Sequence, residues 1–287
     1  MKILVIGHSV VDHIRKGNLI SVKPGGIFYT VTALVKLAGV SDEINLLTNY
    51  DSKNLHLFFD IFSKVNTAYS EKVAAVPVVH LVIKETGERE ECYGNICEKL
   101  KIDKIENLNK FDAVLINMIT GFDIDVNDLE IIRKKFKGRI YLDIHTLSRD
   151  YGDKAIRNFR IIPGAAKWIA GADFIQVNES ELKTLFDLKS EYEIAEEVLK
   201  CGEKVLIITK AGKGAKMYYL KNKNVNSLFI PAEKTEGLNK VGCGDVFGAA
   251  FLLAYFKKFS LTQALKKANL AAAFAAGNNF DKLENLF

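Results

Sequence analysis

The chain has 287 residues, enough for one large domain or two small ones with a substantial core. Hydrophobic residues make up 48% and charged residues 26%, values of an ordinary globular protein rather than of a disordered or fibrous one. The net charge of +5 is mild, and Lys and Arg are spread along the chain, which argues against a nucleic-acid-binding stripe.

The start of the sequence and the spacing of its cysteines bear on where the protein is located and on whether it holds a metal or disulfides. The opening MKILVIGH has an apolar run too short for a signal peptide, and no run approaches the ~18 apolar residues of a membrane span. The cysteines show no C-x-x-C pair and no regular spacing, which argues against a zinc site or a disulfide framework. We therefore expect a cytoplasmic protein that binds neither nucleic acid nor membrane.

Short β-rich runs alternate with longer helical patterns along the chain. Continuous apolar runs of this length suit a parallel sheet that is covered on both faces. Strands are predicted at 2–7, 43–48, 111–117, 139–144, 172–177 and 204–209. Helices are predicted at 29–38, 52–64, 127–137, 179–187, 191–201, 245–257 and 261–276. This order predicts a doubly wound α/β fold, with a mainly parallel sheet flanked by helices.

Two regions, at about 8–23 and 66–95, hold strand-like residues without intervening helices. Residues 76–91 have the pattern of a hairpin that turns at Thr86-Gly87. We expect these regions to form a small β-sheet lid inserted into a single domain of residues 1–287, because no flexible linker interrupts the chain. An exposed lid sheet would offer an edge for pairing, and hence for a homodimer.

The stretch NKVGCGDVFGAAFLLAYF (239–256) carries the strongest chemical signal. A helix N-terminus exposes backbone N–H groups, and the small residues Gly242, Cys243 and Gly244 would let a phosphoryl group approach them. Asp245 could then accept a proton from a hydroxyl beside that cradle. The alternative is that Asp245 caps the helix and the glycines only shape a turn.

Three further stretches each allow a functional and a structural interpretation. Asn178 and Glu181 open a helix after a strand, so they could hold hydrated Mg²⁺ at the sheet edge or form a capping box. ITKAGKGA (208–215) is either a turn between strands or a loop over nucleotide phosphates. Asp12, with the pair Gly25-Gly26 before a helix, is either a solvated turn or a polyol site.

Taken together and in order, these stretches resemble the ribokinase-like (PfkB) carbohydrate kinase family, over nearly the whole chain. The matching landmarks are Asp12, Gly25-Gly26, Asn178-x-x-Glu181, TKAGKG and GCGDVFGAAF. The resemblance implies transfer of the ATP γ-phosphate to a hydroxyl of a sugar or a nucleoside. A catalytically weak family member that senses sugar or nucleotide by binding is the alternative from another class.

The resemblance also implies residue roles. Asp245 would be the base, with the amides of 242–245 as the anion hole, and Asn178 and Glu181 would organise magnesium. The acceptor would be contacted by Asp12, Gly25, Gly26 and Thr30. The nucleotide would be contacted by Asn178, Thr209, Lys210, Gly212, Gly214 and Gly244.

The chain departs from the family pattern at three places. Asn239-Lys240 stand where the family usually has Asp-Thr, which argues against the monovalent-cation site of some members. Thr30 stands where the family commonly has Asn, so we expect different sugar contacts. In LDIHTLSRDYGD (142–153), His145 and Arg149 either face the substrate or lie on the surface.

Overall fold

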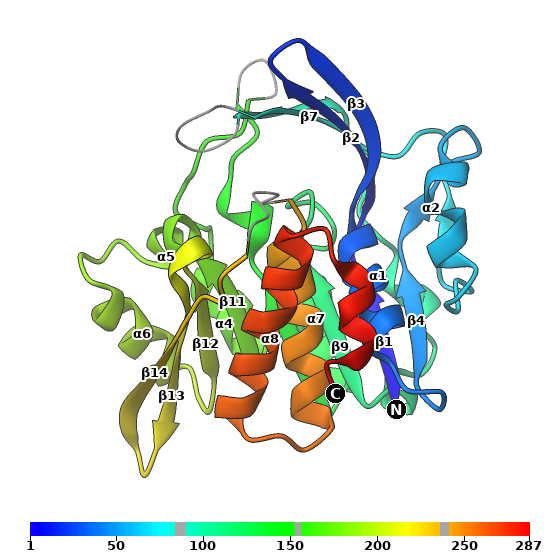
Figure 1. Cartoon of the computed structure of the whole chain (residues 1–287). Helices are drawn as coiled ribbons and strands as arrows, with labels where there is room; N and C mark the ends of the chain where they lie inside the picture. The colour runs from blue at the N-terminus through cyan, green and yellow to red at the C-terminus, as the bar shows by residue number, and fades with distance from the viewer. Residues whose placement is uncertain (84–89, 153–155, 236–240) are drawn as a thin grey trace.

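The computed structural model describes residues 1–83, 90–152, 156–235 and 241–287. Within them, the larger sheet has the strand order β14-β13-β12-β11-β10-β9-β1-β4 (Figure 1). The strands from β12 to β4 pair in parallel, whereas β13 and β14 add an antiparallel edge. The bounds are β1 (Lys2–Ile6), β4 (Glu43–Leu47), β9 (Ala113–Asn117), β10 (Arg139–Asp143), β11 (Phe174–Asn178), β12 (Val205–Thr209), β13 (Gly214–Lys221) and β14 (Asn224–Pro231).

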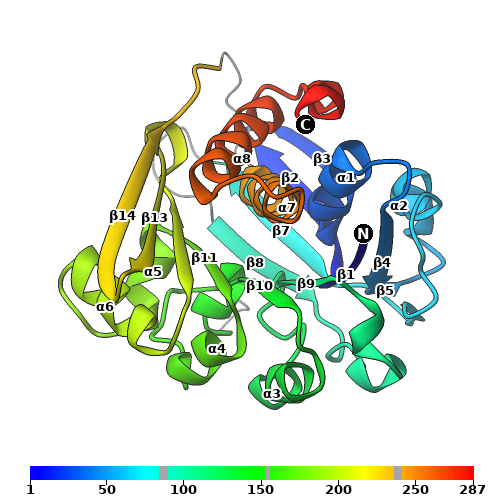
Figure 2. The same ribbon diagram turned by 90° about the horizontal axis from the view of Figure 1, so that it is seen from below.

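Helices cover both faces of this sheet (Figure 2). Alternate strand residues bury into two separate cores: Ile3 and Val5 lie in the core under α1, α7 and α8, and Leu4 and Ile6 in the core under α3 to α6. This two-sided burial explains the continuous apolar runs of the strands. The helices are α1 (Ile27–Leu37), α2 (Leu55–Phe62), α3 (Val126–Lys135), α4 (Ala165–Gly171), α5 (Glu179–Leu185), α6 (Glu191–Lys200), α7 (Cys243–Phe256) and α8 (Leu261–Ala276). Short 3-10 helices lie at η1 (Ile102–Lys104), η2 (Leu108–Lys110), η3 (His145–Ser148), η5 (Ala211–Lys213) and η6 (Phe280–Asn285).

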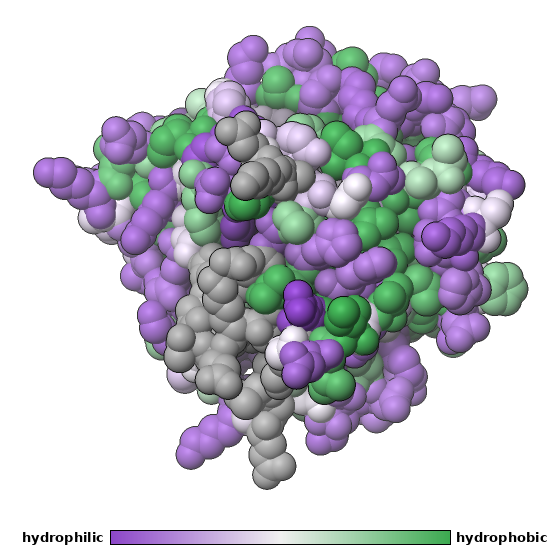
Figure 3. Space-filling view, turned by 90° about the horizontal axis from the view of Figure 1, so that it is seen from above, coloured by the Kyte–Doolittle hydropathy of each residue, from purple (hydrophilic) through white to green (hydrophobic). Residues whose placement is uncertain are grey.

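A separate small sheet, in the order β3-β2-β7-β8, stands above one edge of the large sheet (Figure 1). Its strands are β2 (Ser9–Lys16), β3 (Leu19–Gly26), β7 (Val78–Ile83) and β8 (Glu90–Asn95). β5 (Asn49–Tyr50) and β6 (Glu71–Lys72) form a separate two-stranded parallel sheet. The predicted hairpin turn at Thr86-Gly87 lies outside the described residues. Seen from the side of the small sheet, hydrophobic residues are interspersed among hydrophilic ones (Figure 3).

The predicted fold class is confirmed, with differences at element ends. α7 begins at Cys243 rather than at 245, so Asp245 lies inside its first turn. α4, with seven residues, is too short to show a helical period in the sequence. β13 follows directly on the TKAGKG stretch as an antiparallel partner of β12. No helix within the described part of the chain is long and apolar enough to cross a membrane.

Candidate active site

The N-terminus of α7 lies at the centre of the candidate site. Gly242 is the N-cap residue, in the left-handed region at φ 80°, and it offers no side chain to the first N–H groups of the helix. A Cβ on Gly242 would come within 3.0 Å of the Tyr29 ring, so this tight approach requires glycine. The positive end of the helix dipole and the bare first turn together favour an anion here.

Asp245 is buried, at 7% exposure, three residues after the N-cap. Its Oδ1 accepts a hydrogen bond from Asn117 Nδ2 at 2.8 Å. The same Nδ2 donates to Thr30 Oγ1 at 2.6 Å. The N-cap of the helix is Gly242 and not Asp245, and the Asp245 carboxylate is held by a hydrogen bond from β9.

One small cavity brings together residues from distant parts of the chain. Asp245 and Gly242 line it from α7, and Asp12 and Gly26 line it from β2 and β3. The carboxylate of Asp12 lies so close to Gly25 that a Cβ there would overlap it, so Gly25 makes room for the acid. The other described residues that line the cavity are Val10, Tyr29, Val79, Leu81, Glu91, Tyr93, Ile119, His145, Thr146 and Val241.

The remaining predicted site residues occupy different positions. Thr30, Gly25, Cys243 and Gly244 are not among the described residues that line the cavity. Thr30 is fully buried. Gly244 is half-buried, and its carbonyl accepts from Gln176 Nε2 at 3.1 Å.

His145 and Arg149 have different surroundings in the structure. His145 lines the cavity, whereas the Arg149 guanidinium lies over the Phe159 ring, 4.0 Å from its centroid, and donates to the carbonyl of Arg157. Of the two alternatives, His145 therefore faces the cavity, and Arg149 contacts the neighbouring loop.

A buried polar network lies beside Asp245. Gln176 Nε2 donates to Asp143 Oδ2 at 2.9 Å and to the Gly244 carbonyl, while Tyr141 donates to Gln176 Oε1. Burial, and then the charges of Glu181 and Asp245, raise the pKa of Asp143 well above its usual value. Burial and the charge of Asp245 raise the pKa of the Cys243 thiol to about 11. The site therefore gathers acidic groups at the carboxyl edge of the sheet, and the raised pKa values of Asp143 and Cys243 favour their uncharged forms.

Asn178 and Glu181 form the capping box of α5. Asn178 accepts from the backbone N–H groups of Ser180 and Glu181, and Glu181 accepts from the backbone and side chain of Asn178. Within the described residues, no three His, Cys, Asp or Glu side chains are close enough together to hold a metal ion by themselves. Mg²⁺ commonly uses one or two carboxylates together with water and substrate phosphates, so Glu181 beside Asp143 fits a hydrated ion of this kind.

The TKAGKG stretch is a turn between β12 and β13 that contains η5. Lys210 forms ion pairs with Glu179 and Glu191, at 3.4 and 2.5 Å, and Lys213 pairs with Glu179 at 3.1 Å. Thr209 Oγ1 donates weakly to the Val177 carbonyl at 3.4 Å. Around Gly212 there is open space, which leaves the backbone of this turn accessible.

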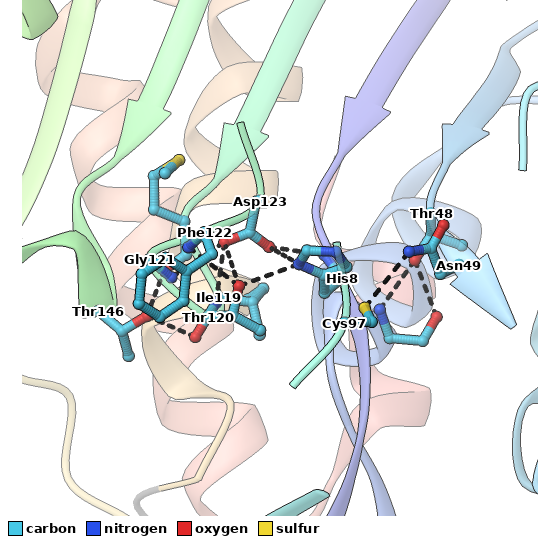
Figure 4. A network of polar contacts seen from close by, with 12 residues as sticks. His8, Thr48, Asn49, Cys97, Ile119, Thr120, Gly121, Phe122, Asp123 and Thr146 are labelled. Atoms are coloured by element: carbon cyan, nitrogen blue, oxygen red, sulfur yellow. Dashed lines mark hydrogen bonds and ion pairs between the residues drawn. The ribbon is translucent and has the colours of Figure 1, made fainter. Parts of the chain in front are cut away.

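A second buried network includes two residues that line the cavity, Ile119 and Thr146 (Figure 4). His8, at the end of β1, faces Asp123, with Nδ1 and Oδ1 3.1 Å apart. Burial opposes the charged imidazolium, but the charge of Asp123 and its hydrogen bond outweigh burial and raise the pKa of His8 to about 10. Asp123 also accepts from the backbone of Thr120, and Thr146 Oγ1 donates to the carbonyl of Ile119. This network fixes Ile119 and Thr146, which line the cavity.

Several residues of the site are not singled out by the sequence patterns. Asn117, Asp143 and Gln176 stand at or near the carboxyl ends of apolar strands, where ligands bind in such folds. A polar residue at the end of a buried strand is the signal that could have found them. Glu91 and Tyr93 lie on β8, and nothing in their spacing marks them as cavity residues.

Comparison with known proteins identifies the family. The model described as "pfkB family carbohydrate kinase" matches residues 108–279, which is more than half of the chain. The chain belongs to the pfkB family of carbohydrate kinases. As a family member, the protein is a carbohydrate kinase. A comparison with curated protein sequences finds no match.

Solved structures of ribokinase-like proteins share the fold of this pfkB-family chain. Ribokinase from Thermotoga maritima has a TM-score of 0.77 at 19% identity, covering 99% of this chain and 98% of the other. Adenosine kinase from Sinorhizobium meliloti has a TM-score of 0.77 at 14% identity, covering 96% and 94%. A pyrophosphate-dependent kinase of the ribokinase family, complexed with a pyrophosphate analog and myo-inositol, has a TM-score of 0.76 at 16% identity, covering 98% and 95%.

Proposed function

We propose that this kinase transfers the γ-phosphate of ATP to a hydroxyl of a sugar or sugar-like small molecule, with Asp245 as the general base. The observation that carries the proposal is the position of Asp245. It lies in the first turn of α7, next to the bare helix N-terminus, and lines the same cavity as Asp12. A base and an anion-binding site thus adjoin one space for an acceptor.

The acceptor site favours hydroxyl groups. Asp12 and Glu91, two carboxylates from the small sheet, line the cavity opposite Asp245, together with the imidazole of His145. Carboxylates accept hydrogen bonds from hydroxyls, and several of them around one cavity orient a polyol. Gly25 and Gly26 let the strand approach closely, and the buried Thr30 acts through Asn117 rather than by direct contact.

The donor site would lie at the carboxyl edge of the large sheet. The amides that follow Gly242 stabilise charge on the transferring phosphoryl group. The turn with Thr209, Lys210, Gly212 and Gly214 lies at the end of β12, the neighbour of the strand that carries Asn178. Asn178 and Glu181 would hold hydrated Mg²⁺, which when bound offsets the negative charge of the phosphates.

The proton transfer needs only residues of this chain. The acceptor hydroxyl donates a hydrogen bond to the Asp245 carboxylate, which takes the proton as the hydroxyl oxygen bonds to the γ-phosphorus. The bond from this phosphorus to the β–γ bridging oxygen breaks in the same step, and ADP leaves. The small sheet, as a lid within one domain of residues 1–287, closes over this reaction and excludes water.

Product formation with defined donors and acceptors tests this function. ADP release and mass spectrometry of the product would follow ATP, and separately pyrophosphate, with sugars, inositols and nucleosides, because the structural neighbours include kinases named for each of these. We expect ATP- and Mg²⁺-dependent phosphorylation of a sugar or polyol, without a requirement for K⁺. Turnover of nucleosides alone would favour the nucleoside alternative, and ligand binding without turnover would favour a sensor.

A further inference from the structure

Asn117, the last residue of β9, stands between the two elements that carry the site. It is 1% exposed, and its Nδ2 donates to Thr30 Oγ1 on α1 and to Asp245 Oδ1 on α7. An amide nitrogen has two N–H groups, so both are used. Its Oδ1 is buried and, among the described residues, has no hydrogen-bond partner.

The orientation of this amide is determined by Asp245. The reverse orientation would place Oδ1 against the carboxylate oxygen, with two acceptors facing each other. The observed orientation instead leaves Oδ1 without a hydrogen bond, which is unfavourable for a buried acceptor. The hydrogen bond from Asn117 Nδ2 to Asp245 is therefore kept although Asn117 Oδ1 is left without a hydrogen bond.

This contact opposes the effect of the surrounding acids. Asp143 on β10 carries a raised pKa, caused by burial, Glu181 and Asp245, and Cys243 on α7 likewise has a raised pKa through burial and Asp245. The other titratable groups around the same cavity are Asp12, Tyr29, Glu91, Tyr93 and His145. A hydrogen bond donated to a carboxylate favours its ionised form. Asn117 on β9 donates to this acid directly, and Thr30 on α1 accepts from the same amide nitrogen; neither side chain titrates.

We propose that Asn117 is a positioning residue for the kinase reaction, which orients the Asp245 carboxylate toward the acceptor and keeps it ionised. The proposal rests on the proposed function, in which Asp245 is the general base. The hydrogen bond from Asn117 restrains Oδ1 of Asp245 and thereby the orientation of the carboxylate. A general base must be both ionised and within reach of the hydroxyl. If the role of Asn117 were only structural, it would connect β9 to α1 and α7 without changing the protonation of Asp245.

The test compares the pH dependence of kcat and kcat/KM for the parent enzyme, Asn117→Ala and Asn117→Ser. We expect Asn117→Ala to lower kcat by about 10–100-fold, with the KM for the phosphoryl donor nearly unchanged. The midpoint of the acid limb of kcat/KM should move to higher pH by about one unit, because the ionised base has lost a donor. Asn117→Ser keeps a shorter donor and should recover part of both effects.

Thr32→Val is the matched control. Thr32 is also buried on α1, and its Oγ1 has no hydrogen-bond partner among the described residues. The change keeps the shape of the side chain, and we expect the parental pH profile and rate. Melting temperatures of all variants show that the enzymes compared are folded, and Asn117→Ser retains the test if Asn117→Ala is too unstable.

An acid limb that stays at the parental midpoint in folded Asn117 variants would overturn the positioning role while leaving the kinase assignment intact. A fall in kcat that is matched by an equal rise in the KM for the donor would also overturn it, because it indicates general distortion. Absence of turnover by the parent with every donor and acceptor would remove the proposed function, and the role of Asn117 with it.

Discussion

Gly242, the N-cap residue of α7, and Gly244, in its first turn, should differ in how much stability the protein loses when each is replaced by alanine. Gly242 has φ 80°, and an added Cβ would come within 3.0 Å of the Tyr29 ring, whereas at Gly244 the nearest atom would be Gln176 Nε2 at 3.6 Å. A left-handed non-glycine residue costs about 1–2 kcal/mol, and overpacking adds about 1–3 kcal/mol. Gly242→Ala should thus lower the free energy of unfolding by roughly 2–5 kcal/mol, and Gly244→Ala should change it by less than about 1 kcal/mol.

Thermal and denaturant unfolding measure this difference. For a chain of this size, we expect Gly242→Ala to lower the melting temperature by roughly 3–8 °C, and Gly244→Ala to leave it within about 2 °C. Gly244→Val should fold, because strain on a left-handed turn belongs to Gly242 and not to Gly244. It should nevertheless lose on the order of 10²-fold in rate, since its side chain enters the space of the phosphoryl group. A Gly242→Ala protein as stable as the parent would refute this reasoning, and near-parental turnover by Gly244→Val would show that phosphate does not bind there.

Three further predictions concern the metal, the buried ion pair and the small sheet. Glu181→Gln should need much more Mg²⁺ for half-maximal rate, whereas an unchanged titration would leave Glu181 as a helix cap only. The raised pKa of His8 means that its pairing with Asp123 stabilises the fold fully below pH 6.5 and is lost as pH rises through about 10. His8→Gln should therefore lose stability at pH 7 and flatten the decline in melting temperature between pH 6.5 and about 10, and an unchanged decline would contradict the pairing. Leu19 and Ile20 are 77% and 69% exposed on the edge strand β3, where a homodimer through the lid would form. The double variant Leu19→Lys/Ile20→Lys should then be monomeric when its mass is measured by light scattering. A parent protein that is already monomeric would exclude this homodimer.

The sequence predicts the architecture well because its physical basis is local. Strands such as 2–7 bury both faces and are therefore continuously apolar, and the all-apolar helix after Asp245 is central, as expected. The position of Gly242 is different. Besides its left-handed conformation, glycine is required there because Tyr29 approaches from α1, a contact between residues more than two hundred positions apart.

The candidate site is predictable only in part, because its support comes from residues that resemble core. Asn117 ends the run AVLIN and Gln176 stands within FIQVN, so each belongs to a strand that the pattern correctly predicts as buried. Their polar groups gain a role only when α7 packs against the carboxyl ends of β9 to β11. Lys210 shows the converse limit: its motif suggests phosphate contact, whereas the structure pairs it with Glu191 from α6.

Asp245→Asn tests the central claim most directly. Asn keeps the volume of the side chain and its oxygen can still accept the hydrogen bond from Asn117, but it does not readily accept a proton. Calorimetry should show that the folded variant binds ATP about as tightly as the parent, while ADP release with the best acceptor falls by about 10²–10⁴-fold. Near-parental turnover by Asp245→Asn would contradict the role of Asp245 as the base on which the proposed reaction depends.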